Sequence, residues 1–210
     1  MKRPAVRADA SEEMEGAWSG LFEDLLRGVV HAMNNRLTAL SAFAELAAMD
    51  DDDVEIEILR EEISRMNGAC ALVGLLVSRS DAEALEVRPV LDSALHVHTY
   101  HPRARAILCV VEQSVDVLPV RVPRWALLRV LLLFVDIAKR EGAAARLASV
   151  SVRVTGDDRI VRVHVVAQGA ASADATRLAG LCGGRIETVG DELVLELPSL
   201  PELRRRERAG

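Results

Sequence analysis

The chain has 210 residues, of which half are hydrophobic and 28% are charged, and its formal net charge is −6. This length predicts one domain or two small ones with a substantial core, and the acidic charge argues against non-specific nucleic-acid binding, which needs a basic face. The cysteines Cys70, Cys109 and Cys182 are odd in number and widely spaced, so they favour no disulfide framework and a reduced, cytoplasmic setting. We expect no secretory signal and no membrane partner, because no stretch approaches the ~20 apolar residues of a transmembrane helix.

Residues 13–80 are predicted to form a hairpin of two long helices, after a disordered start over residues 1–12. In the first helix, apolar residues recur at steps of three and four: Phe22, Leu26, Val29, Met33, Leu37, Leu40, Ala44 and Ala47. In the second helix, the steps alternate regularly over three heptads: Ile56, Leu59, Ile63, Met66, Cys70, Val73 and Val77. Ser11 is the expected cap of the first helix, and Asp50–Asp53 the expected solvated turn. Two helices cannot enclose such a seam, so we expect a homodimer whose hairpins form a four-helix bundle.

Residues 84–200 alternate helices and strands, so the predicted fold class is α+β: the helical hairpin, then an α/β sandwich. The predicted helices cover residues 89–100, 125–140 and 172–182. A buried strand is expected over 106–112, a polar–apolar stretch over 115–122, and two β-hairpins over 150–166 and 185–197. Gly142 and Gly183-Gly184 are expected just after the ends of the second and third helices. Residues 201–210 are expected to be a frayed, charged tail.

The candidate site is the segment His31-Ala32-Met33-Asn34-Asn35-Arg36-Leu37-Thr38, in the middle of the first helix. Asn35 should lie directly above His31 on one helix face, at the edge of the seam and partly in water. A neutral imidazole with an exposed nitrogen is a good nucleophile for phosphorus, and a nearby carboxamide can orient a water or a phosphoryl oxygen.

Each of these residues also has a simpler interpretation. His31 is otherwise an ordinary surface histidine, and Asn34 and Asn35 could simply fix the helix register. Because Asn is a mediocre helix former, two adjacent Asn residues in mid-helix favour a function. Arg36 is either solvated or in contact with a phosphoryl group or an acidic partner.

This segment resembles the H-box of bacterial sensor histidine kinases, especially those whose phospho-accepting His is followed by Asn-Asn-x-Leu-Thr. The resemblance implies that residues 13–80 are a dimerisation and phosphotransfer domain with His31 as the acceptor. It also implies that the α/β part is similar to the kinases' ATP-binding domain, whose usual ending resembles Gly183-Gly184-Arg185-Ile186-Glu187 followed by Leu193–Leu197. Ala32 stands where many kinases place an acidic general base, and Asn35 where the family keeps a residue that dephosphorylates the partner receiver.

The α/β part departs from the family where ATP would bind. The family's metal-binding Asn is missing from the helix over 129–140, and the whole chain has no Asn after Asn67. The family's Asp-x-Gly-x-Gly loop corresponds to Ala167-Gln168-Gly169-Ala170-Ala171, without the Asp, and the short interval between Gly169 and Gly183 leaves no room for the flexible lid. Phosphoryl transfer from ATP depends on metal and electrostatic positioning, so we expect no ATP cofactor and no kinase activity.

Together the resemblance and the departures imply a histidine phosphotransferase of a two-component phosphorelay. A response-regulator receiver domain, which would bring its own magnesium and aspartate, would donate a phosphoryl group to His31, and the phosphohistidine would donate it to another receiver. The receiver is expected to dock on the hairpin with Asn34, Asn35 and Arg36 at the rim. Two alternatives remain open: a pseudokinase scaffold that binds a receiver without chemistry, and an active kinase with an unorthodox nucleotide site.

Other candidate sites are weaker. His96, His98 and His101 are not expected to bind a metal, because steps of two and three do not place all three on one helix face. Asp136 is either a relic of a nucleotide site or part of a polar helix face.

Overall fold

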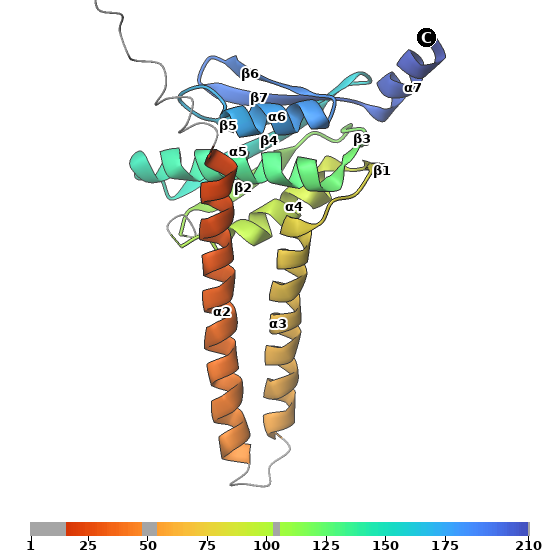
Figure 1. The fold of residues 1–210 in the computed structure, drawn as a ribbon. Coiled ribbons are helices and arrows are strands. Elements are labelled where there is room, and N and C mark those ends of the chain that lie inside the picture. The colour runs from red at the N-terminus through yellow and green to blue at the C-terminus, as the bar shows by residue number, and fades with distance from the viewer. Residues whose placement is uncertain (1–15, 48–53, 103–105, 210) are drawn as a thin grey trace, which may run out of the picture.

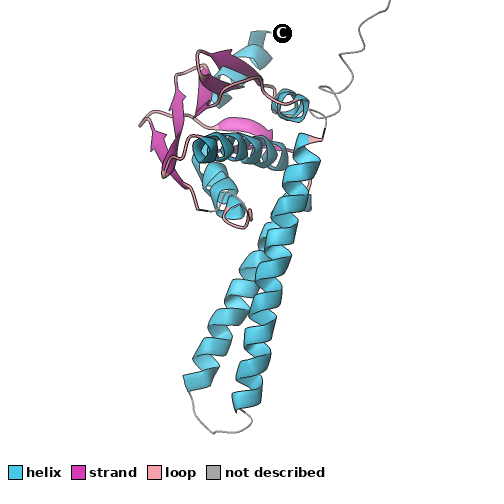
Figure 2. Cartoon of the chain, turned by 90° about the vertical axis from the view of Figure 1, so that its left-hand side faces the viewer, coloured by secondary structure: helices cyan, strands magenta, loops and turns pink. Residues whose placement is uncertain are grey.

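The computed structural model describes residues 16–47, 54–102 and 106–209. Two long helices, α2 (Ala17–Ala47) and α3 (Val54–Val77), lie side by side, and the rest of the chain forms an α/β body at one end of this hairpin (Figure 1; Figure 2). The predicted helical hairpin is therefore confirmed. The predicted disordered start, the Ser11 cap and the Asp50–Asp53 turn lie outside the described residues.

The main sheet of the body has five strands in the order β2–β4–β5–β7–β6. Their bounds are β2 (Leu108–Gln113), β4 (Ser149–Gly156), β5 (Ile160–Val166), β6 (Arg185–Val189) and β7 (Glu192–Pro198). Strand β2 runs parallel to β4, and every other neighbouring pair is antiparallel. Both predicted β-hairpins are confirmed. A small second sheet, which the sequence did not predict, pairs β1 (Ala82–Leu85) with β3 (Val120–Pro123).

The helices α4 (Val87–His98), α5 (Arg124–Ala144) and α6 (Ala173–Leu181) cover the inner face of the sheet, and α4 and α5 lie between the sheet and the hairpin (Figure 2). The core is almost entirely aliphatic: Phe134 of α5 is fully buried among leucines and valines from the helices and the inward-facing strand positions. This packing follows from period-two strands laid against an apolar helix face. It gives the body a closed core of its own.

Two elements of the body differ from expectation. Strand β2, predicted to be buried, is an edge strand, so Leu108 and Val110 point away from the helices and stay exposed. Helix α5 does not stop before Gly142 but continues to Ala144. Gly142 instead serves close packing, because a Cβ there would lie 2.5 Å from the Cγ1 atom of Val150.

The charged C-terminal segment is a helix, α7 (Leu200–Ala209), and the expectation of a frayed tail was wrong. The Ser199 hydroxyl accepts the backbone N–H of Glu202 at 3.3 Å, which caps the start of the helix. Arg205 pairs with Asp158 of the β4–β5 turn at 2.7 Å, and Arg121 of β3 pairs with Glu207 at 3.3 Å. These long-range ion pairs hold α7 against the body.

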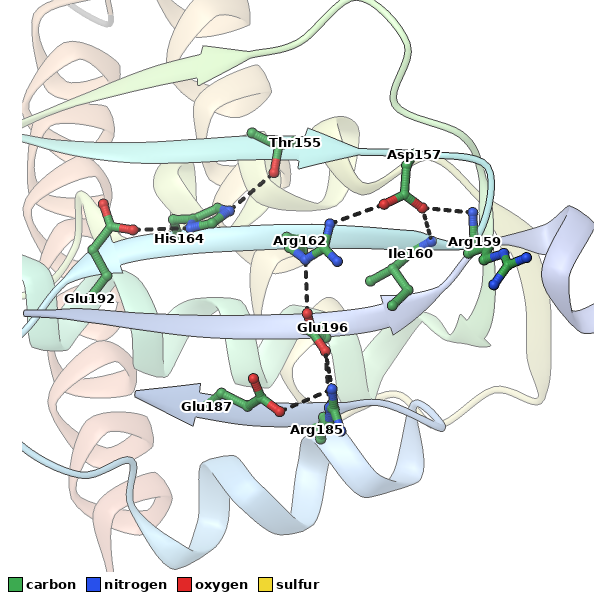
Figure 3. A network of polar contacts seen from close by, with 10 residues as sticks. All are labelled: Thr155, Asp157, Arg159, Ile160, Arg162, His164, Arg185, Glu187, Glu192 and Glu196. Atoms are coloured by element: carbon green, nitrogen blue, oxygen red, sulfur yellow. Dashed lines mark hydrogen bonds and ion pairs between the residues drawn. The ribbon is translucent and has the colours of Figure 1, made fainter. Parts of the chain in front are cut away.

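The outer face of the sheet carries a network of charged side chains (Figure 3). Glu196 accepts hydrogen bonds from Arg162 at 2.8 Å and from Arg185 at 2.8 and 2.9 Å. Burial alone would raise the pKa of Glu196, but these two arginines outweigh it and lower the pKa below its ordinary value. His164 bridges Thr155 and Glu192, both at 3.1 Å. The opposite charges on this face pair with one another, and this face of the sheet is turned to solvent.

The hairpin has two unlike halves. Near the body, its buried residues are Leu21, Leu25 and Val29 of α2 with Ala69, Leu72 and Leu76 of α3. The predicted stripe on α2 was therefore partly wrong: Phe22 and Leu26 are only half-buried, because the body covers the neighbouring face. Away from the body, Leu37 and Ile63 are exposed although both are large and apolar.

Candidate functional site

His31 lies on an exposed face in the middle of α2, one helical turn before Asn35. The Asn35 Nδ2 atom lies 3.3 Å from His31 Nε2, so the predicted juxtaposition on one helix face is confirmed. When the ring proton is on Nδ1, Nε2 accepts a hydrogen bond from the Asn35 carboxamide nitrogen. This tautomer leaves a lone pair on the nitrogen that is nearest Asn35. Asn34 is also exposed, and its backbone carbonyl accepts the Thr38 hydroxyl at 3.0 Å.

Arg36 connects the two helices of the hairpin. It donates from Nη1 to Glu62 of α3 at 2.9 Å, and Glu62 also accepts from Arg65. Hydrogen bonds from Arg65 and Arg36 hold the pKa of Glu62 below its ordinary range. Arg36 is therefore not fully solvated, because it pairs with Glu62 within the chain. Its predicted contact with a phosphoryl group or an acidic partner stays a prediction. This ion pair places Arg36 of α2 and Glu62 of α3 at the same height along the hairpin.

An open cleft of about 710 Å³ lies beside His31. One wall comes from α2 and the other from the turn that follows α4. Its lining is Arg27, Gly28, His31, Ala32, Asn35 and Arg36, with Thr99, Tyr100 and Pro102 opposite. The sequence interpretation missed Arg27, which helix spacing could have revealed because it stands one turn before His31 on the same face. It also missed Tyr100, for which no local signal exists.

Close contacts join the body to the hairpin near this cleft. A Cβ added at Gly28 would overlap the carbonyl oxygen of Tyr100, so only glycine lets the turn approach α2 this closely. Higher up, Arg129 of α5 donates to the Leu76 carbonyl at 2.8 Å. Its guanidinium lies 5.0 Å from the ring centre of Trp18 and 4.9 Å from that of Trp125. The body therefore contacts both helices.

A buried polar cluster lies where α2, α4 and α5 meet. Asp136 receives His98 Nε2 at 3.3 Å and Arg140 at 2.7 Å, and the His98 and His101 rings stack with centres 5.1 Å apart. His101 Nε2 also lies 3.6 Å from Asp24 of α2. Burial lowers the pKa of His101, although Asp136 and Asp24 act in the opposite direction. Asp136 is thus buried where α4 and the turn after it pack against α5. Across the described residues no group of side chains is arranged to hold a metal ion.

The residues at the position expected for ATP do not fit magnesium-ATP. A depression of about 340 Å³ there is lined by Ile137, Glu141, Gln168 and Gly169 among others. The Glu141 carboxylate accepts the Gln168 backbone N–H at 2.7 and 2.6 Å. The Gln168 N–H is therefore already occupied by a carboxylate, and Arg140 lines the same depression. Helix α5 contributes no carboxamide to replace the missing metal ligand.

No protein-family model and no curated protein matches this sequence. Among solved structures, the Acinetobacter baumannii histidine kinase AdeS is 13% identical with a TM-score of 0.42, over 81% of this chain and 98% of that chain. Histidine kinase ThkA, in complex with response regulator protein TrrA, is 16% identical with a TM-score of 0.45, over 92% and 66%. A bacterial phosphotransferase is 15% identical with a TM-score of 0.40, over 84% and 95%. At these identities the likeness concerns the order of helices and strands and says nothing of chemistry. In the described ranges, no helix has the length and apolar character needed to cross a bilayer.

Proposed function

We propose that this chain is a histidine phosphotransferase of a two-component phosphorelay, which carries phosphoryl groups between receiver aspartates on His31. The observation that carries the proposal is the state of His31 itself. Its ring is exposed, its Nε2 faces the carboxamide of Asn35 at 3.3 Å, and the pair lines an open cleft of about 710 Å³. The segment also resembles the H-box through Asn34-Asn35-Arg36-Leu37-Thr38.

The chemistry is a reversible exchange between an acyl phosphate and a phosphoramidate. The Nε2 lone pair attacks phosphorus, the bond from phosphorus to the aspartyl oxygen breaks, and the carboxylate leaves with the electron pair. Asn35 can then turn its N–H from Nε2 to a phosphoryl oxygen. The Nδ1 proton is released to water as the new P–N bond forms. In this tautomer the attacking nitrogen carries no proton, and with Ala32 at the neighbouring position the Nδ1 proton passes to water rather than to an acidic side chain.

The same proposal includes a homodimer built on the hairpin. Ile56, Ile63, Cys70 and Val77 recur every seven residues on α3, and all four are exposed in the single chain. Leu37 of α2 lies near the level of Ile63, because its neighbour Arg36 pairs with Glu62. One apolar stripe therefore runs along both helices. A second hairpin would cover it, giving a four-helix bundle with two His31 sites.

We further propose that the protein works without ATP and that magnesium arrives with the receiver. The Glu141 carboxylate on the Gln168 N–H and the absence of a carboxamide on α5 support this. The α/β body then serves to support the hairpin and to form one wall of the cleft.

The test is transfer of labelled phosphate from phosphorylated receiver domains to the chain, beside a reaction with labelled ATP and magnesium. We expect acid-labile label from a receiver, none from ATP, and complete loss in His31→Ala with the dimer intact. His164→Ala removes a histidine on the outer face of the sheet, away from the cleft, and is the control. Label from ATP would make the protein a kinase. Label from no receiver would leave a scaffold role, and a labelled His31→Ala dimer would refute the assignment.

A further inference from the structure

The turn after α4 forms the wall of the cleft that faces His31. Thr99, Tyr100 and Pro102 line this wall. Tyr100 is partly buried, and its ring meets His96 edge-on with centres 6.1 Å apart. The backbone N–H groups of Thr99 and Tyr100 donate to the carbonyls three residues earlier, those of His96 and Val97, both at 3.1 Å, so a tight turn follows the last residues of α4. The wall is thus an ordered turn at the end of a helix.

The distance between this wall and His31 is fixed from two sides. Gly28 lies three residues before His31, and it admits the Tyr100 carbonyl where any side chain would collide. Immediately after Tyr100, His101 is buried between Asp24 of α2 and Asp136 of α5. The turn is therefore held to the helix that carries the nucleophile and to the centre of the body at once.

The charged side chains that line the cleft are arginines, although the protein is acidic. Among the described residues, the lining contains two arginines and no carboxylate, in a chain of net charge −6. Arg27 pairs with Glu23 at 3.3 Å and with Asp24 at 3.2 Å, and the Arg27 side chain is largely exposed. Exposed pairs of this kind are weak, so Arg27 can exchange them for another carboxylate. The cleft suits a surface that carries negative charge.

We propose that this turn is a second docking surface for the receiver domain and that Tyr100 is a specificity-determining residue. The inference rests on the proposed function. A receiver surface with an aspartyl phosphate and a carboxylate-bound magnesium is acidic, which matches the exposed Arg27. His31 and the turn line the same cleft, so a receiver that brings its phosphorus to Nε2 lies beside the turn, and a phosphoryl group alone fills little of this volume. The receiver therefore contacts Tyr100 and Pro102 while it reacts at His31.

The experiment compares two phosphoryl donors on the full chain. Phosphorylated receiver needs docking, whereas phosphoramidate is a small donor that reaches His31 without it. In Tyr100→Ala we expect the rate from the receiver to fall about tenfold, as for a buried interface tyrosine, and the rate from phosphoramidate to stay unchanged. Val115→Ala is the control, because Val115 is 98% exposed at the opposite end of β2 from the turn.

Two substitutions of opposite charge at Pro102 keep the test valid if Tyr100→Ala folds poorly. Pro102 is exposed, and Pro102→Glu and Pro102→Lys both remove the ring while they add opposite charges. Only Pro102→Glu should slow transfer from the receiver. Equal receiver rates in Pro102→Glu and Pro102→Lys, or a Tyr100→Ala variant slowed with both donors, would overturn the docking role while leaving the phosphotransferase in place. Failure of wild-type protein to accept phosphate from any receiver would instead overturn the proposed function.

Discussion

The α/β body and the far half of the hairpin differ in how deeply their apolar residues are buried. In the body, Phe134 and Leu195 are completely buried, whereas in the hairpin Ile63 is 51% and Leu37 is 47% exposed. Burying apolar surface contributes about 25 cal/mol per Å². Burial of its own apolar side chains therefore stabilises the body much more than it stabilises the far half of the hairpin. The difference teaches that the body closes its own core, whereas the far half of the hairpin leaves apolar surface that the proposed dimer would cover.

The largest expected effect would come from a charge on the exposed stripe of the hairpin. Ile63→Asp should weaken the dimer by roughly 10²- to 10⁴-fold, because each of two copies loses the burial of an isoleucine, about 1.5–3 kcal/mol per side chain, and gains a carboxylate that must be desolvated. Sedimentation velocity across a concentration series measures the dissociation constant. Circular dichroism should show the body still folded.

The matched control is Ser64→Asp, which adds the same charge at the next position. Ser64 is exposed and falls one heptad after Glu57, which already carries a carboxylate on that face. We expect it to leave the dimer unchanged. A dimer that tolerates Ile63→Asp would mean that the stripe is not its interface, and the contrast between the two regions would need another explanation.

The second prediction tests the contact between the regions with a pair of glycines on the same helix. Gly28→Ala should destabilise the protein by about 1–3 kcal/mol, as overpacking usually does, because the new Cβ meets the Tyr100 carbonyl. Gly20→Ala meets nothing within 4 Å and should stabilise by about 0.5–1 kcal/mol through helix propensity. Chemical denaturation of both variants supplies the two values. Equal effects at the two positions would show that the body does not rest on α2 at Gly28.

Much of this arrangement is readable from the sequence, and the exceptions have physical causes. Asn35 above His31 follows from helix geometry within one element, so it was predictable. Tyr100 opposite His31 was not, because its position depends on how α4 packs against α5 and on a glycine whose role appears only when two elements meet. The order of α7 similarly depends on Asp158, far away in the chain. Local periodicity therefore predicts the individual helices and strands, whereas the cleft forms only when α2 and the turn after α4 pack together.

The smallest expected effect concerns His101, which lies between the two regions. Burial lowers its pKa from the ordinary value of 6.5, so the folded protein favours the neutral ring. Above pH 6.5 both states are neutral there and no penalty arises. As the pH falls below 6.5 the unfolded chain binds the proton first, so the stability should decrease, by at most about 1.4 kcal/mol per pH unit for one group.

The comparison is between wild type and His101→Gln, unfolded by denaturant from pH 7.5 to 5.5. The glutamine keeps a donor toward Asp24 and Asp136 but cannot titrate, so its stability should fall less steeply with acid. His98 and Arg140 face the same cluster in both proteins. His96→Gln, at an exposed position, should retain the wild-type slope. Identical slopes in all three proteins would show that the junction is indifferent to protonation of His101; a shallower slope in His101→Gln alone would make that residue an acid-sensitive part of the contact between body and hairpin.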